Sequence, residues 1–247
     1  MKITIITVCY NSAATIEKTI LSVAAQTHGN IEYIIIDGNS KDGTLDLIQK
    51  HGDKISKWIS EPDRGLYDAM NKGIALATGD LIGILNSDDI FYSNTVLEEI
   101  AAYHSVNFID ASIGNITQHK NNGTIVRLYS SEYWNPEKLK IASMPPHPSI
   151  FFKRDLFKKF GNYNLGFKIG ADYELITRFF MKHNINWGYS GITTTSMLIG
   201  GLSSSGVSSY ALITKEIQKA LHMNGILFSA FNIKMRFIWK IKGFVIK

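Results

Sequence analysis

Apolar runs that alternate with helical segments constrain the fold of this chain more than any other feature of its sequence. Residues 3–9, 31–36 and 55–59 form three such runs, and segments of helical periodicity separate them. A helix predicted over residues 66–77 then leads to a fourth run at 81–85. Strand, helix and strand in this order predict βαβ units, whose strands pair in parallel. We therefore expect an α/β fold with a central, mostly parallel sheet flanked by helices.

The rest of the sequence is less regular, and it contains no internal repeat. Its patterns predict strands at 109–118, 124–129 and 150–152, helices at 95–103, 155–160 and 171–183, and extended segments at 187–189 and 192–199. No interdomain linker is evident before residue 200. We expect one domain over residues 1–209, followed by a basic, amphipathic helical extension over residues 210–247.

Polar clusters lie at the carboxyl ends of three of the predicted strands. They are Thr7 to Asn11, Asp37 to Ser40, and Asn86 to Asp89. Because the carboxyl ends of parallel strands lie on one edge of a sheet, and open α/β sheets bind ligands there, we expect the clusters to converge. An exposed Tyr10 beside Asp37 suits a planar heterocycle. The pair Asp88-Asp89 fits a divalent cation, or alternatively a helix cap.

Charge is concentrated at one end of the chain. The net charge is +5, yet residues 210–247 carry seven Lys/Arg and one acid, Glu216, so the preceding 209 residues have a net charge of −1. A body without excess positive charge does not suit a nucleic-acid-binding surface. The one cysteine, Cys9, cannot form an internal disulfide and indicates a reducing compartment.

Five segments give the sequence a specific resemblance. In chain order they read TVCYN (7–11), IIIDGNSKDGT (34–44), DRGLYDAMNKGIALATGDLIGILNSDD (63–89), HPSIFF (147–152) and GADYELITRF (170–179). Their order and spacing resemble the family 2 glycosyltransferases of GT-A fold, in particular bacterial members that build surface polysaccharides. The resemblance extends from the first residue to about residue 209.

The resemblance implies a donor site for a nucleotide-sugar. Tyr10 would stack on the nucleobase and Asp37 would bind it, usually uracil of a UDP-sugar. Asp63 and Arg64 would contact the donor and its phosphates. Lys72 would line the same site, although a lysine at such a position is more often a solvated helix charge. The residues assigned to nucleotide-sugar binding are Thr7, Tyr10, Asn11, Asp37, Asn39, Asp63, Arg64, Asn71, Lys72, Ser87 and Asp88.

The metal motif of the family departs from its usual form here. The family commonly has Asp-x-Asp-Asp, whereas this chain has Asn86 at the first position. Two carboxylates, Asp88 and Asp89, remain. Since Mg²⁺ or Mn²⁺ takes few protein carboxylates together with diphosphate oxygens and water, we expect metal dependence to survive, with Asp88 ahead of Asp89 as ligand.

The same resemblance assigns a catalytic base. Inverting transfer needs a carboxylate that removes the proton of the acceptor hydroxyl, and Asp172 occupies the family's position for it. Glu174 is the alternative if the alignment slips, and a first-turn helix acid is the structural alternative for Asp172. His147 would border the acceptor side or be structural. Residues 200–203 resemble a loop that closes over the donor, or form a plain connector.

The C-terminal segment allows two interpretations. Its longest uncharged run, residues 220–233, has 14 residues, which is short for a membrane span. Aromatic and basic side chains interleave beyond it, which is typical of a helix on an anionic membrane surface. Alternatively, the segment packs on the domain with its lysines in water. Membrane contact would suit a lipid-linked acceptor and a cytoplasmic protein on the inner face of the plasma membrane.

The sequence thus predicts an inverting, metal-dependent hexosyltransferase-type enzyme. It would move a sugar from a nucleotide-sugar to a lipid-linked saccharide during O-antigen, capsule or exopolysaccharide synthesis. Two alternatives are a sugar-1-phosphate nucleotidyltransferase and a non-catalytic nucleotide-sugar-binding protein. The first would require a Gly-rich, Arg-containing phosphate loop after the first strand, and residues 7–15 do not contain one.

Overall fold

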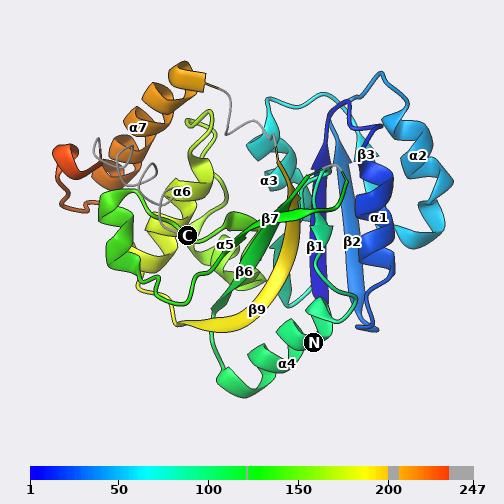
Figure 1. The fold of residues 1–247 in the computed structure, drawn as a ribbon, viewed down its shortest axis with the longest axis horizontal. Coiled ribbons are helices and arrows are strands. Elements are labelled where there is room, and N and C mark those ends of the chain that lie inside the picture. The colour runs from blue at the N-terminus through cyan, green and yellow to red at the C-terminus, as the bar shows by residue number, and fades with distance from the viewer. Residues whose placement is uncertain (121, 200–205, 234–247) are drawn as a thin grey trace. The chain divides into compact units, whose positions relative to one another are not determined.

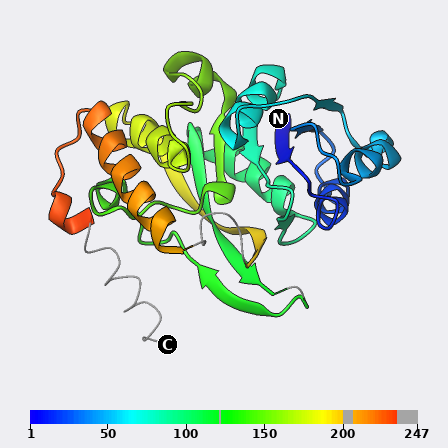
Figure 2. The ribbon, with the colours of Figure 1, turned by 90° about the horizontal axis from the view of Figure 1, so that it is seen from above.

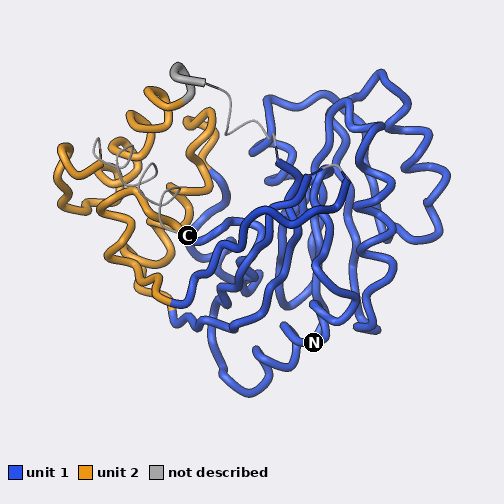
Figure 3. Tube along the Cα trace, viewed as in Figure 1, with its two compact units in different colours: residues 1–132, 145–163, 186–199 blue, residues 133–144, 164–185, 200–247 orange. Residues whose placement is uncertain are grey.

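The structure is a computed structural model that describes residues 1–120, 122–199 and 206–233 (Figure 1). The chain divides into two compact units (Figure 3). The first unit comprises residues 1–132, 145–163 and 186–199, and the second comprises residues 133–144, 164–185 and 200–247. The loop predicted at 200–203 and the aromatic and basic residues of 234–247 lie outside the described residues.

A nine-stranded sheet, counted over the described residues, forms the centre of the first unit. Its strand order is β3-β2-β1-β4-β8-β6-β9-β5, and β7 pairs with β6. The strands are β1 (Ile3–Cys9), β2 (Ile31–Asp37), β3 (Lys57–Ser60), β4 (Leu81–Ile84), β5 (Ile90–Phe91), β6 (Ala111–His119), β7 (Ile125–Tyr129), β8 (Ile150–Lys153) and β9 (Trp187–Leu198).

The strands β3, β2, β1 and β4 run parallel to one another, as the βαβ pattern predicts. Their register places Cys9 opposite Asp37 and Asp37 opposite Ser60, so three strands end on the same edge. β1, β4 and most of β2 are buried because both faces of this half-sheet are covered. The predicted α/β fold with flanking helices is therefore confirmed.

Helices cover the two faces of the sheet in the first unit (Figure 1, Figure 2). The apolar side chains of α1, α2 and α4 share a core with Ile3, Ile5 and Ile35 on one face. On the other face α3 approaches β1 closely: a Cβ on Gly73 would lie 2.4 Å from Ile6 Cγ2. The helices of this unit are α1 (Ile16–Ala24), α2 (Thr44–Lys50), α3 (Leu66–Leu76), α4 (Val96–Asn107) and α5 (Arg154–Phe160).

The second half of the sheet mixes directions. β8 is antiparallel to β4 and β6, whereas β9 is parallel to β6. The sequence predicts two extended segments at 187–189 and 192–199, but β9 is one strand. Its register against β6 shifts near Asn115, and Gly191 has a φ of 74°, which glycine adopts without steric cost. Gly191, which separates the two predicted segments, thus marks an irregularity within the single strand β9.

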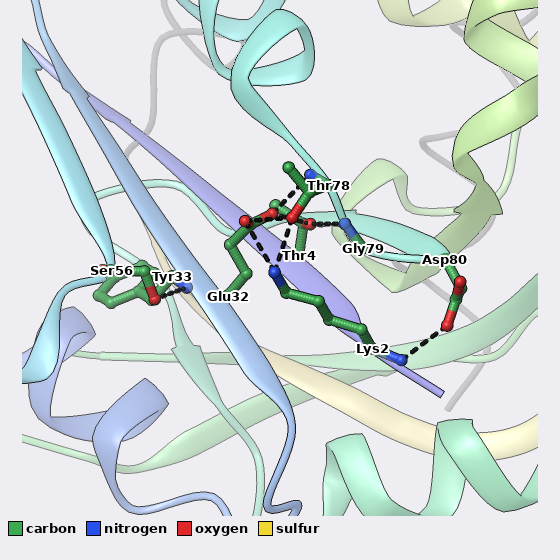
Figure 4. A network of polar contacts seen from close by, with 8 residues as sticks. All are labelled: Lys2, Thr4, Glu32, Tyr33, Ser56, Thr78, Gly79 and Asp80. Carbon is green, nitrogen blue, oxygen red and sulfur yellow. Dashed lines mark hydrogen bonds and ion pairs between the residues drawn. The ribbon is translucent and has the colours of Figure 1, made fainter.

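At the amino ends of the parallel strands, Glu32 on β2 forms hydrogen bonds with the start of β1 and with the turn before β4 (Figure 4). Its carboxylate accepts hydrogen bonds from Thr4 Oγ1 (2.6 Å), from Lys2 Nζ (3.0 Å), and from Thr78 N (2.7 Å) and Oγ1 (2.6 Å). Burial by itself would raise the pKa of Glu32, but these hydrogen bonds lower it to about 2. Glu32 is therefore ionised across the physiological pH range.

The second unit is helical in its described residues. It contains a 3-10 helix at Pro136–Ile141, the helix α6 (Ala171–Ile176) and a π-helix at Thr177–Lys182, followed later in the chain by α7 (Gly206–Met223). The predicted helix 171–183 starts where expected, but its hydrogen bonding changes at Thr177.

Packing explains how this unit holds together. Trp134 and Phe180 meet edge to face at 5.3 Å, and the Tyr173 hydroxyl donates to the carbonyl of Leu139. On α7, Ile217 and Leu221 are buried. Residues 210–223 of the predicted extension therefore pack as a helix within this unit. None of the helices in the described ranges is both long and apolar enough to cross a bilayer.

Candidate active site

Hydrogen bonds join the carboxyl ends of β1, β2 and β4. The backbone N–H of Asn11 donates to Ser40 Oγ at 2.8 Å, and that of Ser12 donates to Thr44 Oγ1 at 2.7 Å. Ser12 Oγ also lies 2.9 Å from Ser87 Oγ. Asn11 has a φ of 50°, a left-handed conformation that Asn tolerates better than most residues. The structure thus brings together the three polar clusters that the sequence predicts to converge.

The carboxylate of Asp37 is the buried centre of this edge. Its Oδ2 accepts from Ser60 Oγ at 2.6 Å and from the Ser40 N–H at 3.1 Å. Its Oδ1 accepts from the Ser40 hydroxyl and, at 3.6 Å, from the Cys9 thiol. A carboxylate offers about four acceptor positions, so these contacts occupy them. In this structure Asp37 ties the ends of β1, β2 and β3 together and has no solvent exposure.

Tyr10 and Asp63 flank the glycine that follows Asp37. A Cβ added to Gly38 would lie 3.4 Å from Tyr10 Cδ2 and 2.5 Å from Asp63 Oδ2. Tyr10 is 64% exposed, and Asp63 Oδ1 accepts from the Gly65 N–H at 2.8 Å. An exposed aromatic ring beside a carboxylate offers stacking and a hydrogen-bond acceptor. Because Gly38 has no side chain, Tyr10 and Asp63 can both lie close to its backbone.

Two basic residues, Arg64 in the loop before α3 and Lys72 on α3, hold this loop in place. Arg64 pairs with Asp68 at 2.8 Å, and hydrogen bonds from Arg64 hold the pKa of the Asp68 carboxyl below its usual value despite partial burial. Lys72 Nζ pairs with Glu61 at 2.8 Å and donates to the Pro62 carbonyl at 2.9 Å. Lys72 therefore contacts the loop from α3. The Arg64 side chain is 77% exposed.

Asn71 and His147 both contact Tyr163. The Asn71 amide donates to the Tyr163 carbonyl and accepts from its N–H, both at 2.9 Å. His147 Nε2 lies 2.6 Å from the Tyr163 hydroxyl. The Tyr67 and Tyr163 rings stack with centroids 5.6 Å apart. Asn71 and His147 thus belong to a cluster that joins α3 to the segments beside β8 and α5.

Thr7 and Asn39, which the sequence assigns to nucleotide-sugar binding, have different surroundings. Thr7 is fully buried and accepts a hydrogen bond from the Tyr33 hydroxyl at 3.2 Å. Asn39 has a φ of 66° and accepts from Lys41 Nζ at 2.6 Å. Asn39 therefore shapes the turn after β2, and Thr7 belongs to the sheet interior.

The acidic pair after β4 has two different environments. Asp89 is 1% exposed, and its Oδ2 accepts from the Asn86 amide at 3.0 Å. Burial, together with the negative charge of Asp88, raises the pKa of Asp89 to about 7. Asp88 is partly exposed. Within the described residues, no group of three or more His, Cys, Asp or Glu side chains could hold a metal ion alone.

The oxygens of Asp88 and Asp89 fit a divalent cation only if phosphate oxygens or water complete its coordination. Asp88 supplies a hard, accessible oxygen, whereas Asp89 is buried and bonded to Asn86. Mg²⁺ and Mn²⁺ commonly take one or two carboxylates plus phosphate oxygens and water. Asn86, which departs from the family pattern, here orients Asp89.

Asp172 lies in the first turn of α6, in the second unit. Its Oδ1 accepts from the N–H of Tyr173 at 2.8 Å, and its side chain is partly exposed. Glu174, the alternative base, is 3% exposed and makes a two-pronged ion pair with Arg178 at 3.0 Å for each bond. Burial and full pairing make Glu174 unsuited to accept a proton from a substrate. Asp172 is thus the more accessible acid of the two.

Sequence reasoning missed several polar residues at these sites. Ser60, which binds Asp37, directly follows the strand predicted at 55–59, and that position is its only sequence signal. Asp68, which binds Arg64, has the i,i+4 spacing of helix ion pairs and could have been found from it. Tyr163 and Glu216 act through contacts between segments distant in sequence, for which the sequence offers no local signal.

Known proteins resemble this chain in sequence. The profile of Glycosyl transferase family 2 matches residues 4–170. A PGL/p-HBAD biosynthesis glycosyltransferase of Mycobacterium bovis (strain BCG / Pasteur 1173P2) is 29% identical over 87% of this chain and 81% of its own length. An uncharacterized glycosyltransferase of Mycobacterium tuberculosis (strain ATCC 25618 / H37Rv) is 34% identical over 71% of this chain and 68% of its own.

Solved structures resemble the fold. S. aureus TarS 1–349 in complex with UDP-GlcNAc superposes with a TM-score of 0.70 at 19% identity, over 90% of this chain and 66% of that chain. The mannosyltransferase PcManGT from Pyrobaculum calidifontis, in complex with GDP-Man and Mn²⁺, has a TM-score of 0.64 at 16% identity, over 90% and 63%. This chain thus spans about two thirds of the length of these solved chains, and at such identities the likeness shows the GT-A fold. Together with the profile match, which covers most of the chain, it shows that this protein belongs to glycosyl transferase family 2.

Proposed function

We propose that this protein is an inverting glycosyltransferase that moves a sugar from a nucleotide-sugar to a lipid-linked saccharide. One observation carries the proposal: hydrogen bonds bring the segments after β1, β2 and β4 together at one edge of the sheet. Tyr10, Gly38, Asp63 and the Asp88-Asp89 pair lie in the segments that follow the strands at this edge. Solved structures of the same fold were obtained in complex with UDP-GlcNAc and with GDP-Man, which supports a nucleotide-sugar donor. From the motif, we take the donor to be a UDP-sugar.

Tyr10 and Asp37 are the proposed contacts for the nucleobase. The exposed Tyr10 ring stacks on the base, and the Asp37 carboxylate accepts an N–H from its edge. Because the acceptor positions of Asp37 are occupied, one serine contact to Asp37 gives way when the base binds. Arg64, whose side chain is largely exposed, can exchange its ion pair with Asp68 for a phosphate. Asp63 takes the donor's ribose or sugar hydroxyls.

Asp88 is the proposed ligand of Mg²⁺ or Mn²⁺, and Asp89 holds the turn. The cation, when bound, neutralises negative charge on the diphosphate leaving group. Asp89 acts through its buried contact with Asn86, which fixes the chain direction at Asp88. His147 is the proposed contact on the acceptor side, positioned by the Tyr163 hydroxyl.

Asp172 is the proposed catalytic base. Its carboxylate removes the proton from the acceptor hydroxyl while that oxygen attacks the anomeric carbon and the bond to the diphosphate breaks. Attack from the side opposite the leaving group inverts the anomeric configuration. The partial exposure of Asp172, compared with the buried and paired Glu174, supports this choice.

A panel of UDP- and GDP-sugars, with and without Mn²⁺, tests the proposal. The expected result is metal-dependent release of nucleoside diphosphate that increases with a lipid-linked acceptor and is nearly abolished in Asp172→Asn, while UDP binding persists. Unchanged turnover in Asp172→Asn would remove the base assignment. Binding without turnover of any donor would instead support the non-catalytic alternative. Pyrophosphate release from a nucleoside triphosphate and a sugar-1-phosphate would support the nucleotidyltransferase.

We further propose a peripheral location on the inner face of the plasma membrane, within O-antigen, capsule or exopolysaccharide synthesis. In the described part of the C-terminal segment, Leu227 is 89% exposed and Phe231 is 68% exposed. Exposed apolar side chains next to a basic sequence suit an anionic lipid surface. Flotation with phosphatidylglycerol vesicles should exceed that with neutral vesicles and decrease in Phe231→Ser. Equal recovery with both kinds of vesicle would contradict membrane contact.

A further inference from the structure

The only acid in the basic C-terminal segment is buried, and it binds the loop before α6. Glu216 of α7 is 8% exposed. Its Oε1 accepts from the Lys168 N–H at 2.7 Å, and its Oε2 accepts from the N–H groups of Ile169 at 2.9 Å and Gly170 at 2.7 Å. One carboxylate therefore satisfies three consecutive backbone donors that immediately precede α6.

This contact depends on a close approach of the two segments. A Cβ added to Gly170 would lie 3.2 Å from both Cβ and Oε2 of Glu216, closer than ordinary van der Waals contact. Hydrogen bonds to a carboxylate are stronger than those between neutral groups, and a buried backbone N–H without a partner destabilises the fold. The loop at 168–170 therefore has a strongly preferred position relative to α7.

A second contact links the same two helices. Asn224, just after α7, donates its side-chain amide to Glu174 Oε1 at 3.2 Å. Glu174 also holds Arg178, so this link reaches from α6 into the following π-helix. Both the start and the middle of α6 are thus bonded to the C-terminal segment, and Asp172 lies between the two contacts.

We propose that Glu216 is a positioning residue for glycosyl transfer. It fixes the backbone of residues 168–170 and thereby the place of Asp172, two residues further on. This inference rests on the proposed function of Asp172 as the base. It gives the C-terminal helix a role in the chemical step in addition to any membrane contact.

The decisive variant is Glu216→Gln, which keeps the size of the side chain but replaces one acceptor oxygen with a donor. At least one of the three backbone N–H groups then faces an NH₂ group. A displacement of the base by about 1 Å can cost about 100-fold, so we expect kcat to decrease about 10- to 100-fold. The donor KM and UDP binding should change little, because the proposed donor contacts lie in the first unit. Glu216→Asp, which keeps both oxygens on a shorter stem, should recover part of kcat.

Glu137→Gln is the matched control, since Glu137 lies in the same unit, is exposed and pairs with Lys140. Its kcat should equal that of the wild type. A double-mutant cycle then tests the route of the effect. In an Asp172→Asn background, Glu216→Gln should cause little further loss, because its effect passes through the base. Independent, multiplying losses would overturn the proposal.

The outcomes separate this inference from the proposed function. If Asp172→Asn retains full kcat, the base assignment fails. If Asp172→Asn is inactive while a folded Glu216→Gln has wild-type kcat, only the positioning role fails. Should Glu216→Gln unfold at the assay temperature, Gly170→Ala takes its place under the same criteria, since the added Cβ presses on Glu216. A lower kcat with unchanged UDP binding supports the proposal, and an unchanged kcat overturns it.

Discussion

Replacement of Glu32 by Gln should destabilise the protein without weakening its binding of donor. Glu32 joins Lys2, Thr4 and Thr78 at the amino ends of the strands (Figure 4). The proposed donor contacts follow the carboxyl ends of these strands. The variant removes the charge and leaves one acceptor oxygen in place of two. It therefore tests whether the two edges of the sheet have separate roles.

The magnitude follows from the pKa of Glu32, which decreases from 4.5 to about 2 on folding. A shift of that size corresponds to about 3 kcal/mol. The Lys2 side chain is 37% exposed, so water screens its contribution, and we expect a loss of about 1–2 kcal/mol. For a chain of this length that loss lowers Tm by about 3–6 °C.

The pH dependence has a defined sign. Because the pKa is lower in the folded protein, Glu32 contributes its full stabilisation above pH 4.5, and the contribution decreases as the pH falls towards 2. The difference in unfolding free energy between wild type and Glu32→Gln should therefore be smaller at pH 3 than at pH 7. Urea unfolding at both pH values measures it, with the exposed Glu132→Gln as control. An equal difference at both pH values, or a reduced affinity for UDP, would refute the reasoning.

Three further variants test the candidate site. Gly38→Ala should weaken UDP binding about tenfold in titration calorimetry, with little change in Tm, because its Cβ displaces Asp63 and contacts Tyr10; unchanged affinity would contradict a base platform there. Asp88→Ala should abolish the thermal stabilisation that Mn²⁺ adds to UDP, and persistence of that stabilisation would exclude Asp88 as a ligand. Asn71→Ala should lower the unfolding free energy by about 1–3 kcal/mol, because the backbone groups of a buried Tyr163 lose their partners; a change below about 0.5 kcal/mol in urea unfolding would contradict it.

The parallel half of the sheet could be predicted because its information is local. Ile-rich runs that alternate with helical segments define β1, β2 and β4, and the βαβ rule then fixes their direction. The convergence of the polar clusters follows from that direction alone. β3 was predicted two residues early, at Ile55, because that buried residue precedes the strand without pairing in it.

The environment of each site residue could not be predicted in the same way. Asp37 has the sequence context of an accessible ligand, yet Ser60 and Ser40 occupy its oxygens because three strands end side by side. The sequence motif ranks Asp88 ahead of Asp89 as a metal ligand, but it does not show that Asp89 is buried while Asp88 is partly exposed. The charge pattern of the sequence places Glu216 in a basic C-terminal extension and does not indicate that it is buried. Its burial depends on a contact with residues 46–48 positions earlier in the chain, which no local pattern encodes.

Turnover of nucleotide-sugars tests the central claim most directly. Purified protein with Mn²⁺ and a lipid-linked saccharide should release nucleoside diphosphate from at least one UDP-sugar. The transferred sugar should have the anomeric configuration opposite to that in the donor, as NMR of the product can show. Asp88→Ala and Asp172→Asn should each lose this activity. Retention of the donor's configuration, or full activity in both variants, would contradict the account.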